Sequence, residues 1–292
     1  AAVALFVPLW VTLAYLPMPF LLLAALVMAR LLWAVRQKNN YPTVAILLLL
    51  LLAEAQSLAG LALGDHDWQR RAVLAAVWLV AAMMTLIGGR VIPFFIQRGL
   101  GRPAAVKPIL WLDRALLLGT ALVAVLHATG QALLPNLPVA LLFLLLGVAH
   151  AVRMGRWFDR GLFGVPLLWS LYLAYAWLVL ACLGMALWHA GWLLNVSQPL
   201  HALTVGSMAG LILAMLSRVT LGHTGRPLVL PAGVSWAFVL LNAGAVSRVF
   251  LVEFWPQAGL WLAMICWSLA FAIYLWRYAP MLWSTRADGH PG

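Results

Sequence analysis

The sequence predicts an all-α fold in which one polytopic bundle of transmembrane helices occupies residues 1–292. Hydrophobic residues make up 65% of the chain and charged residues only 9%. The mean hydropathy is +1.01, far from the composition of soluble domains. Apolar runs of about twenty residues, the length that crosses a bilayer, recur along the whole chain. These observations together define a multi-pass membrane protein.

About ten apolar segments are separated by charged residues or by Pro and Gly breaks. The first is a truncated segment over 1–15. Helices are then predicted over 19–36, 42–63, 71–91, 109–129, 137–151, 166–188, 198–219, 231–252 and 257–278. No nucleotide-binding loop, zinc-protease motif or nucleophile elbow interrupts them.

The basic residues predict the topology. If the helices alternate in direction, one side collects all but three of the 18 Lys and Arg residues, the three being Arg70, Arg71 and Arg248. This matches the positive-inside rule, so the basic side and the C-terminus are expected in the cytoplasm. The net charge of +11 is thereby explained by topology, and no nucleic-acid surface is predicted.

The predicted helix 198–219 has two different flanks. At about 100° per residue, one flank carries His201, Thr204, Met208, Leu211, Met215 and Arg218, and the other carries Gly206, Gly210 and Ala214. Such a ridge of small residues lets a neighbouring helix approach closely in lipid. The polar and sulfur-containing flank is expected to face the interior of the bundle. A rise of ~1.5 Å per residue places His201 and His223 roughly 33 Å apart, so they cannot share one ion.

Two motifs resemble the signature of a known family. One is HALTVG at 201–206, followed by SRVTLGHTGRPL at 217–228, and the other is GGRVIPFF at 88–95. In this order they resemble the NnrS family of bacterial inner-membrane proteins. That family has about a dozen helices, is described as containing haem and copper, and is linked to nitric oxide metabolism. The resemblance implies a b-type haem and copper as cofactors, and a role in the response or resistance to nitric oxide.

Six histidines lie near the ends of the predicted helices. His66, His127, His189 and His201 fall on the periplasmic side, and His150 and His223 on the cytoplasmic side. Imidazole suits both haem iron and copper, and thioethers suit Cu(I). The candidate clusters are therefore His201 with His127 or His189, and His223 with His150; Met208 and Met215 are further candidate metal ligands. The alternative for each histidine is an interfacial residue that contacts water.

Arg90, Arg218 and Arg226 lie close to the cytoplasmic interface, where two roles are open. They can extend to lipid phosphates or bind haem propionates by charge-assisted hydrogen bonds. Glu54 lies in the middle of a predicted helix beside Gln56, and a carboxylate at that depth usually faces a cavity or a partner. It is a candidate protonatable group, or else a neutral residue hydrogen-bonded to its neighbours.

The chain departs from the family pattern in places. It begins on Ala1 within an apolar run and has no charged leader segment, so the family's first helices are expected to precede it. Tyr172 stands where many relatives are expected to carry a histidine. Two other functional classes stay open: a haem oxidoreductase with quinol or nitric oxide as substrate, and a haem-free transporter that uses Glu54 and the arginines to move a solute or metal.

Overall fold

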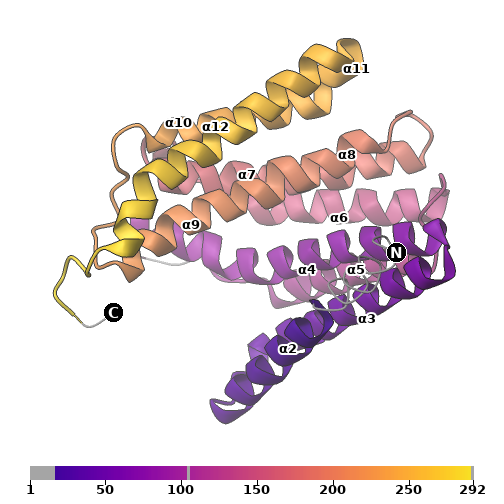
Figure 1. The fold of residues 1–292 in the computed structure, drawn as a ribbon, viewed down its shortest axis with the longest axis horizontal. Helices are drawn as coiled ribbons and strands as arrows, with labels where there is room; N and C mark the ends of the chain where they lie inside the picture. Colours follow the sequence, from indigo (N-terminus) through magenta and orange to yellow (C-terminus); the bar gives the residue numbers. More distant parts are fainter. Residues whose placement is uncertain (1–16, 104–105, 291–292) are drawn as a thin grey trace, which may run out of the picture. The chain divides into compact units, whose positions relative to one another are not determined.

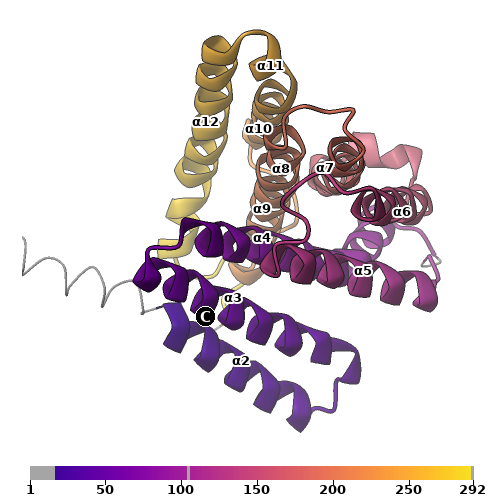
Figure 2. The same cartoon turned by 90° about the vertical axis from the view of Figure 1, so that its right-hand side faces the viewer.

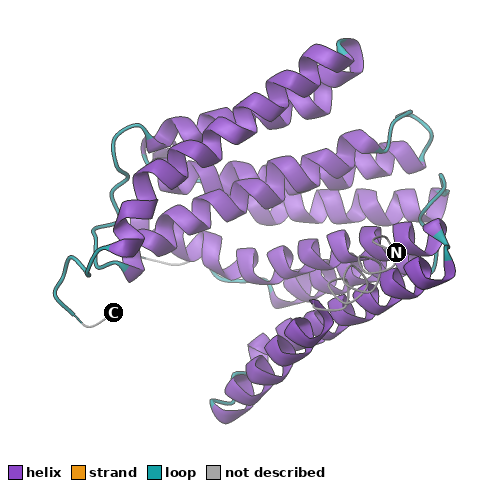
Figure 3. Cartoon of the chain, viewed as in Figure 1, coloured by secondary structure: helices purple, strands orange, loops and turns teal. Residues whose placement is uncertain are grey.

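The computed structural model describes residues 17–103 and 106–290, which form helices and loops without any strand (Figure 3). Within these residues, nine helices are long and apolar enough to cross a membrane. The predicted all-α membrane fold is therefore confirmed. The predicted segment over 1–15 lies outside the described residues.

The chain divides into two compact units. Unit 1 comprises Ala1–Ile87 and Asp113–Leu134, and unit 2 comprises Gly88–Leu112 and Pro135–Gly292. Two helices, α4 (His66–Gly99) and α5 (Leu110–Ala128), contribute residues to both units.

Unit 1 contains α2 (Pro17–Ala34), α3 (Tyr41–Leu63) and the unit 1 parts of α4 and α5. Helices α2 and α3 pack side by side as a hairpin across the short 3-10 turn η1 (Lys38–Asn40) (Figure 2). Helix α3 begins with Pro42 in its first turn, where the missing N–H costs no hydrogen bond. It ends at Gly64, which has a φ of 67°, a left-handed conformation that glycine adopts without strain.

Unit 2 contains the helices that follow residue 135. They are α6 (Leu137–Gly155), η2 (Arg160–Gly164), α7 (Pro166–His189), α8 (Ser197–His201), η3 (Ala202–Met208), α9 (Ala209–His223), α10 (Val234–Val246), η4 (Ser247–Leu251), α11 (Val252–Phe254) and α12 (Pro256–Trp283). Helix α7 packs on α6 and on the η3–α9 segment, and α10 packs on α12 (Figure 1). Helix α7 is therefore the centre of this unit.

Two predicted helices contain a feature that the sequence did not predict. The spans Ser197–His223 and Val234–Phe254 agree with the predictions over 198–219 and 231–252. Each includes a π-helical segment, η3 in the first and η4 in the second. Such wider turns are rare and often occur at functional sites.

Helix α4 is longer than predicted. The sequence placed its end at residue 91, just before Pro93, but the helix continues through Pro93 to Gly99. This prediction was wrong because proline is tolerated inside transmembrane helices, where neighbouring groups compensate for the lost backbone bond. The carbonyl deprived of its bond belongs to Gly89, four residues earlier.

Candidate functional site

The small-residue ridge of the long helix packs on α7. A Cβ atom on Gly206 would lie 2.5 Å from Cδ2 of Trp177, and one on Gly210 would lie 2.9 Å from the Cβ of Ala174. Both distances are shorter than van der Waals contact, so only glycine allows this approach. The glycine flank is buried, whereas His201 and Met208 on the opposite flank are half-buried. The ridge was predicted correctly. The opposite flank is not exposed either, since its members are half-buried and Arg218 is 7% exposed, so the expectation that it faces the interior of the bundle stays a prediction.

His201 lies at the junction between α8 and η3, and its ring is held in one orientation. Its Nδ1 lies 2.6 Å from the carbonyl oxygen of Ser197. A carbonyl only accepts, so Nδ1 carries the proton and donates it, and Nε2 is left with a lone pair. Metal-ligating histidines typically show this arrangement, in which one ring nitrogen donates to a backbone carbonyl and the other faces the metal.

A cation lies beside this histidine, and an acid contacts the neighbouring Gln198. The hydroxyl of Ser197 is 3.0 Å from His201 Nδ1, and Nη2 of the half-buried Arg248, in η4, lies 3.5 Å from the same hydroxyl. Next to Ser197, Gln198 donates a hydrogen bond of 3.2 Å to Glu253. Of the two π-helical segments, η3 thus follows His201 directly in the sequence, and η4 contains Arg248, which contacts Ser197 beside His201.

A second polar cluster lies inside unit 2, where α6 meets α7. The Tyr175 hydroxyl accepts a hydrogen bond of 2.9 Å from Arg153 Nε and lies 2.7 Å from His150 Nδ1. The Tyr175 hydroxyl uses its lone pairs to accept from the Arg153 guanidinium, so its own proton can be donated to His150 Nδ1. Nδ1 is then the acceptor, and the imidazole proton of His150 is on Nε2. His150 is 0% and Arg153 4% exposed. The guanidinium also lies 5.3 Å from the ring centroid of Trp157.

The glycine pair of the GGRVIPFF motif lies against this cluster. A Cβ on Gly89 would lie 2.7 Å from Arg153 Nη1, and one on Gly88 would lie 3.8 Å from the Tyr175 ring. Gly89 therefore makes room for a buried guanidinium, because any side chain would displace it. The arginine on the neighbouring helix thus accounts for the second glycine of the motif.

The two motifs meet at Arg218. Its guanidinium lies 3.8 Å from the ring centroid of Phe95, the last residue of GGRVIPFF, and the residue is 7% exposed. A desolvated cation over an aromatic face is worth roughly 2 kcal/mol. Arg218 is thus buried against an aromatic ring, so a direct lipid-phosphate contact is not its main environment.

The remaining candidate histidines lie in different environments. His127, in unit 1, is 1% exposed, stacks on Trp78 with ring centroids 6.2 Å apart, and has Nδ1 2.9 Å from the carbonyl of Val123. His189 stacks on Phe143 with centroids 5.5 Å apart. The predicted cytoplasmic pair does not form in the described residues, because His150 is enclosed against Tyr175 while His223 is exposed.

The turn that contains His223 is covered by the C-terminal tail. Arg286 donates to the carbonyl of His223 at 3.2 Å, and the amide of Ala287 donates to the carbonyl of Thr224 at 3.0 Å. Arg226 donates to Ser284 Oγ at 3.0 Å. The predicted cofactor-binding Arg226 is thus engaged with the tail. Arg90, a further candidate, has an exposed side chain.

A surface ion pair joins the loops that follow α4 and α6. Arg102 Nε lies 2.9 Å from Asp159 Oδ2, and this bond lowers the pKa of the Asp159 carboxyl, with a further contribution from the Gly161 amide. Asp159 also caps η2 through Gly161. The pair fixes the loop arrangement beside the Arg153 cluster, and its solvent exposure makes it a weak contributor to stability.

The structure offers single donors rather than a preformed metal cage. Among the described residues, no group of three or more His, Cys, Asp or Glu side chains is close enough to hold an ion. Met208 and Met215 lie roughly 10 and 21 Å along the helix from His201 at ~1.5 Å per residue, so these three do not form one centre.

Sequence reasoning missed Arg153 and Tyr175 as functional candidates and treated Arg248 only as a topology marker. One signal was available: His150 and Arg153 are three residues apart and share a helix face. The other partner, Tyr175, becomes visible only once α6 packs on α7.

Comparison with known proteins gives one match. The model of the NnrS protein family matches residues 1–286. No curated protein and no solved structure matches the chain. Since the family match spans nearly the whole chain and contains both motifs, the chain belongs to the NnrS family.

Proposed function

We propose that the protein binds haem within the membrane, with His201 as a ligand of the iron, and acts in the response to nitric oxide. The observation that carries the proposal is the 2.6 Å bond between His201 Nδ1 and the Ser197 carbonyl. It fixes the tautomer and leaves Nε2 as the donor atom on a half-buried ring. His201 also opens the HALTVG motif of the family.

The donor set fits haem better than copper. Haem iron needs one or two axial ligands from the protein, and a single oriented imidazole is a sufficient proximal ligand. A protein copper site combines several nitrogen and sulfur ligands. In the described part of the chain, no three or more His, Cys, Asp or Glu side chains form such a set, so copper remains an expectation from the resemblance and no step is derived through it.

The residues around His201 would hold the cofactor and set its surroundings. Ser197 orients the imidazole, and Arg248 places a positive charge on the same side, suited to a propionate carboxylate. A haem held by these residues would supply an iron that can bind diatomic molecules such as nitric oxide. The bond from Nδ1–H to the carbonyl raises the basicity of Nε2 and so strengthens it as a ligand.

We also propose a location in the bacterial inner membrane with the C-terminus in the cytoplasm. If the membrane-spanning helices alternate in direction, Arg70, Arg71 and Arg248 fall on the opposite side from the other basic residues. The positive-inside rule assigns the richer side to the cytoplasm. His201 would then lie near the periplasmic face.

The test compares His201→Ala with His66→Ala in the full-length protein. His66 is exposed at the start of α4, which makes it the matched control. Absorbance in the Soret region and haem extraction should show that His201→Ala loses most of its haem while His66→Ala retains it. Protection of the buried thiol of Cys182 verifies that both variants are folded.

Two results would contradict the proposal. One is unchanged haem content and an unchanged Soret spectrum in His201→Ala. The other is wild-type protein purified without a Soret band, which favours the transporter class. Glu54, the residue named for that class, is half-buried and does not line the cavity of unit 1.

A further inference from the structure

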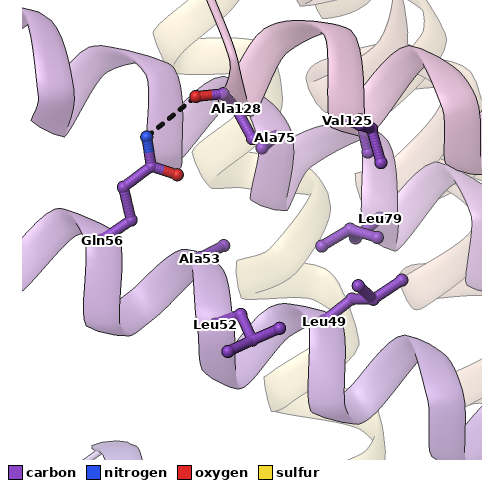
Figure 4. A pocket seen from close by; sticks show the side chains of 9 residues that line it. Leu49, Leu52, Ala53, Gln56, Ala75, Leu79, Val125 and Ala128 are labelled. Carbon is purple, nitrogen blue, oxygen red and sulfur yellow. Dashed lines mark hydrogen bonds between the residues drawn. The ribbon is translucent and has the colours of Figure 1, made fainter.

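Unit 1 contains a small cavity that is lined mainly by apolar side chains. It lies among α3, α4 and α5 and has a volume of about 160 Å³ (Figure 4). Ala53, Ala75 and Ala124 form buried walls, with 6%, 2% and 2% exposure. One alanine comes from each helix, so three short side chains meet where larger ones would fill the space. The rim includes Leu52 and Val125, which are 63% and 45% exposed.

The size and lining of the cavity restrict its occupant. An enclosed apolar cavity of about 150 Å³ remains dry and binds a molecule of the size of benzene; this cavity has a similar volume and is open at its exposed rim. Sites for larger cofactors and drug-sized ligands measure roughly 300–1,000 Å³. This cavity therefore suits one small ring and is too small for a haem.

One polar group lies at the end of the cavity. Gln56 Nε2 donates to the carbonyl of Ala128 at 2.9 Å (Figure 4). Because a carbonyl only accepts, the amide nitrogen must face Ala128, and the orientation of the amide is fixed. Its oxygen Oε1 is then the remaining acceptor, and no described side chain or backbone group donates to it. A ligand with one hydroxyl group can supply that hydrogen bond.

We propose that this cavity binds one small aromatic alcohol, a phenol-class ring soluble in the membrane. The ring lies among Ala53, Ala75 and Ala124, and the hydroxyl donates to Gln56 Oε1. The apolar walls provide most of the affinity, and the glutamine provides the preference for a hydroxyl over an unsubstituted ring. This site lies in unit 1 and is independent of His201.

The test uses phenol and benzene as probes of the purified full chain in nanodiscs. One hydrogen bond should make phenol bind about two- to tenfold more tightly than benzene. Ala124→Leu should fill the cavity and abolish saturable binding of both probes. Ala115→Leu is the matched control, since Ala115 is exposed on the same helix. Gln56→Leu should still bind benzene but lose the preference for phenol.

A second measurement on the wild-type protein does not depend on how the variants fold. With methyl-labelled alanine, phenol should shift the NMR signals of Ala53, Ala75 and Ala124 in a saturable way and leave that of Ala115 unchanged. The proposal is overturned if wild-type protein binds neither probe saturably or binds both equally. It is also overturned if Ala124→Leu binds as the wild type does, or if the cavity methyl signals do not move.

Discussion

The close approach of η3 to α7 makes Gly206 sensitive to the smallest possible change. In Gly206→Ala, the new methyl group would lie 2.5 Å from Cδ2 of Trp177. Contact between carbon atoms needs about 3.5–4.0 Å, so the indole must move by ~1 Å or the helices must separate. Trp177 is 6% exposed and donates from Nε1 to Asn242 at 2.9 Å. The ring therefore cannot shift without disturbing a second helix.

The expected cost follows from these contacts. Overpacking a close-packed interior costs typically about 1–3 kcal/mol. Weakening the bond between Trp177 and Asn242 adds about 0.5–1.5 kcal/mol. A replaced glycine gains about 0.5–1 kcal/mol in helix propensity, which offsets part of the loss. The free energy of unfolding should thus fall by about 1–3 kcal/mol, and more for Gly206→Leu.

The natural cysteines provide the assay. Cys182 and Cys266 are both buried, so a thiol-reactive fluorophore reports unfolding in detergent as temperature rises. The matched control is Gly222→Ala on the same long helix, where a Cβ meets no atom within 4 Å; it should be neutral or slightly stabilising. If Gly206→Ala melts together with Gly222→Ala, the ridge does not hold the helices together.

Three other outcomes are expected. Tyr175→Phe removes one acceptor of the buried Arg153, so the free energy of unfolding should fall by about 1–3 kcal/mol; an unchanged transition in the thiol assay would refute this. Val229→Cys should react with an impermeant thiol reagent only after cells are opened, whereas Asp67→Cys should react in intact cells, and the reverse pattern would invert the topology. The Arg286 guanidinium lowers the pKa of the Asp288 carboxyl from 3.8 to about 2. Because the folded pKa is the lower one, the ion pair between Arg286 and Asp288, which flank Ala287, is fully present above about pH 4 and lost as the pH falls toward 2. Protection of the Ala287 amide from exchange should therefore decrease over that range, and constant protection down to pH 2 would exclude this linkage.

Hydropathy, together with the charged, Pro and Gly residues between apolar segments, predicted the fold well, because each membrane-spanning helix must carry its own apolar surface. The helix predicted over 137–151 occurs as Leu137–Gly155, and that over 166–188 occurs as Pro166–His189. The π-helical segments were not predictable, since they depend on how two helices fit together. Pro93 misled the prediction for α4 because its local penalty is offset by surroundings that the sequence does not display.

The candidate site was only partly predictable. The glycine ridge follows from spacing along one helix, and it was found. The Tyr175 cluster depends on the pairing of α6 with α7, and nothing in single-helix periodicity assigns a partner. Arg153 resembled any cytoplasmic arginine in the sequence, yet it is 4% exposed. Besides the spacing of His150 and Arg153, the structure shows the importance of Gly89, whose missing side chain creates the space for the guanidinium.

The long helix formed by α8, η3 and α9 links two chemically different ends of unit 2. At one end, His201 has a fixed ring with an available Nε2, and at the other, Arg218 is buried on Phe95. Between them, Gly206 and Gly210 pack against α7 at contact distance. The long helix therefore cannot rotate about its axis without bringing larger side chains into a clash with α7. The π-helical turns of η3 immediately follow His201, so they set the direction of its ring relative to the ridge. A change that restores regular α-helical geometry in η3, such as deleting one residue between His201 and Gly206, should therefore keep the packing of Arg218 on Phe95. It should turn the imidazole away from Arg248 and, under the proposed function, lower haem content without lowering thermal stability by a comparable amount.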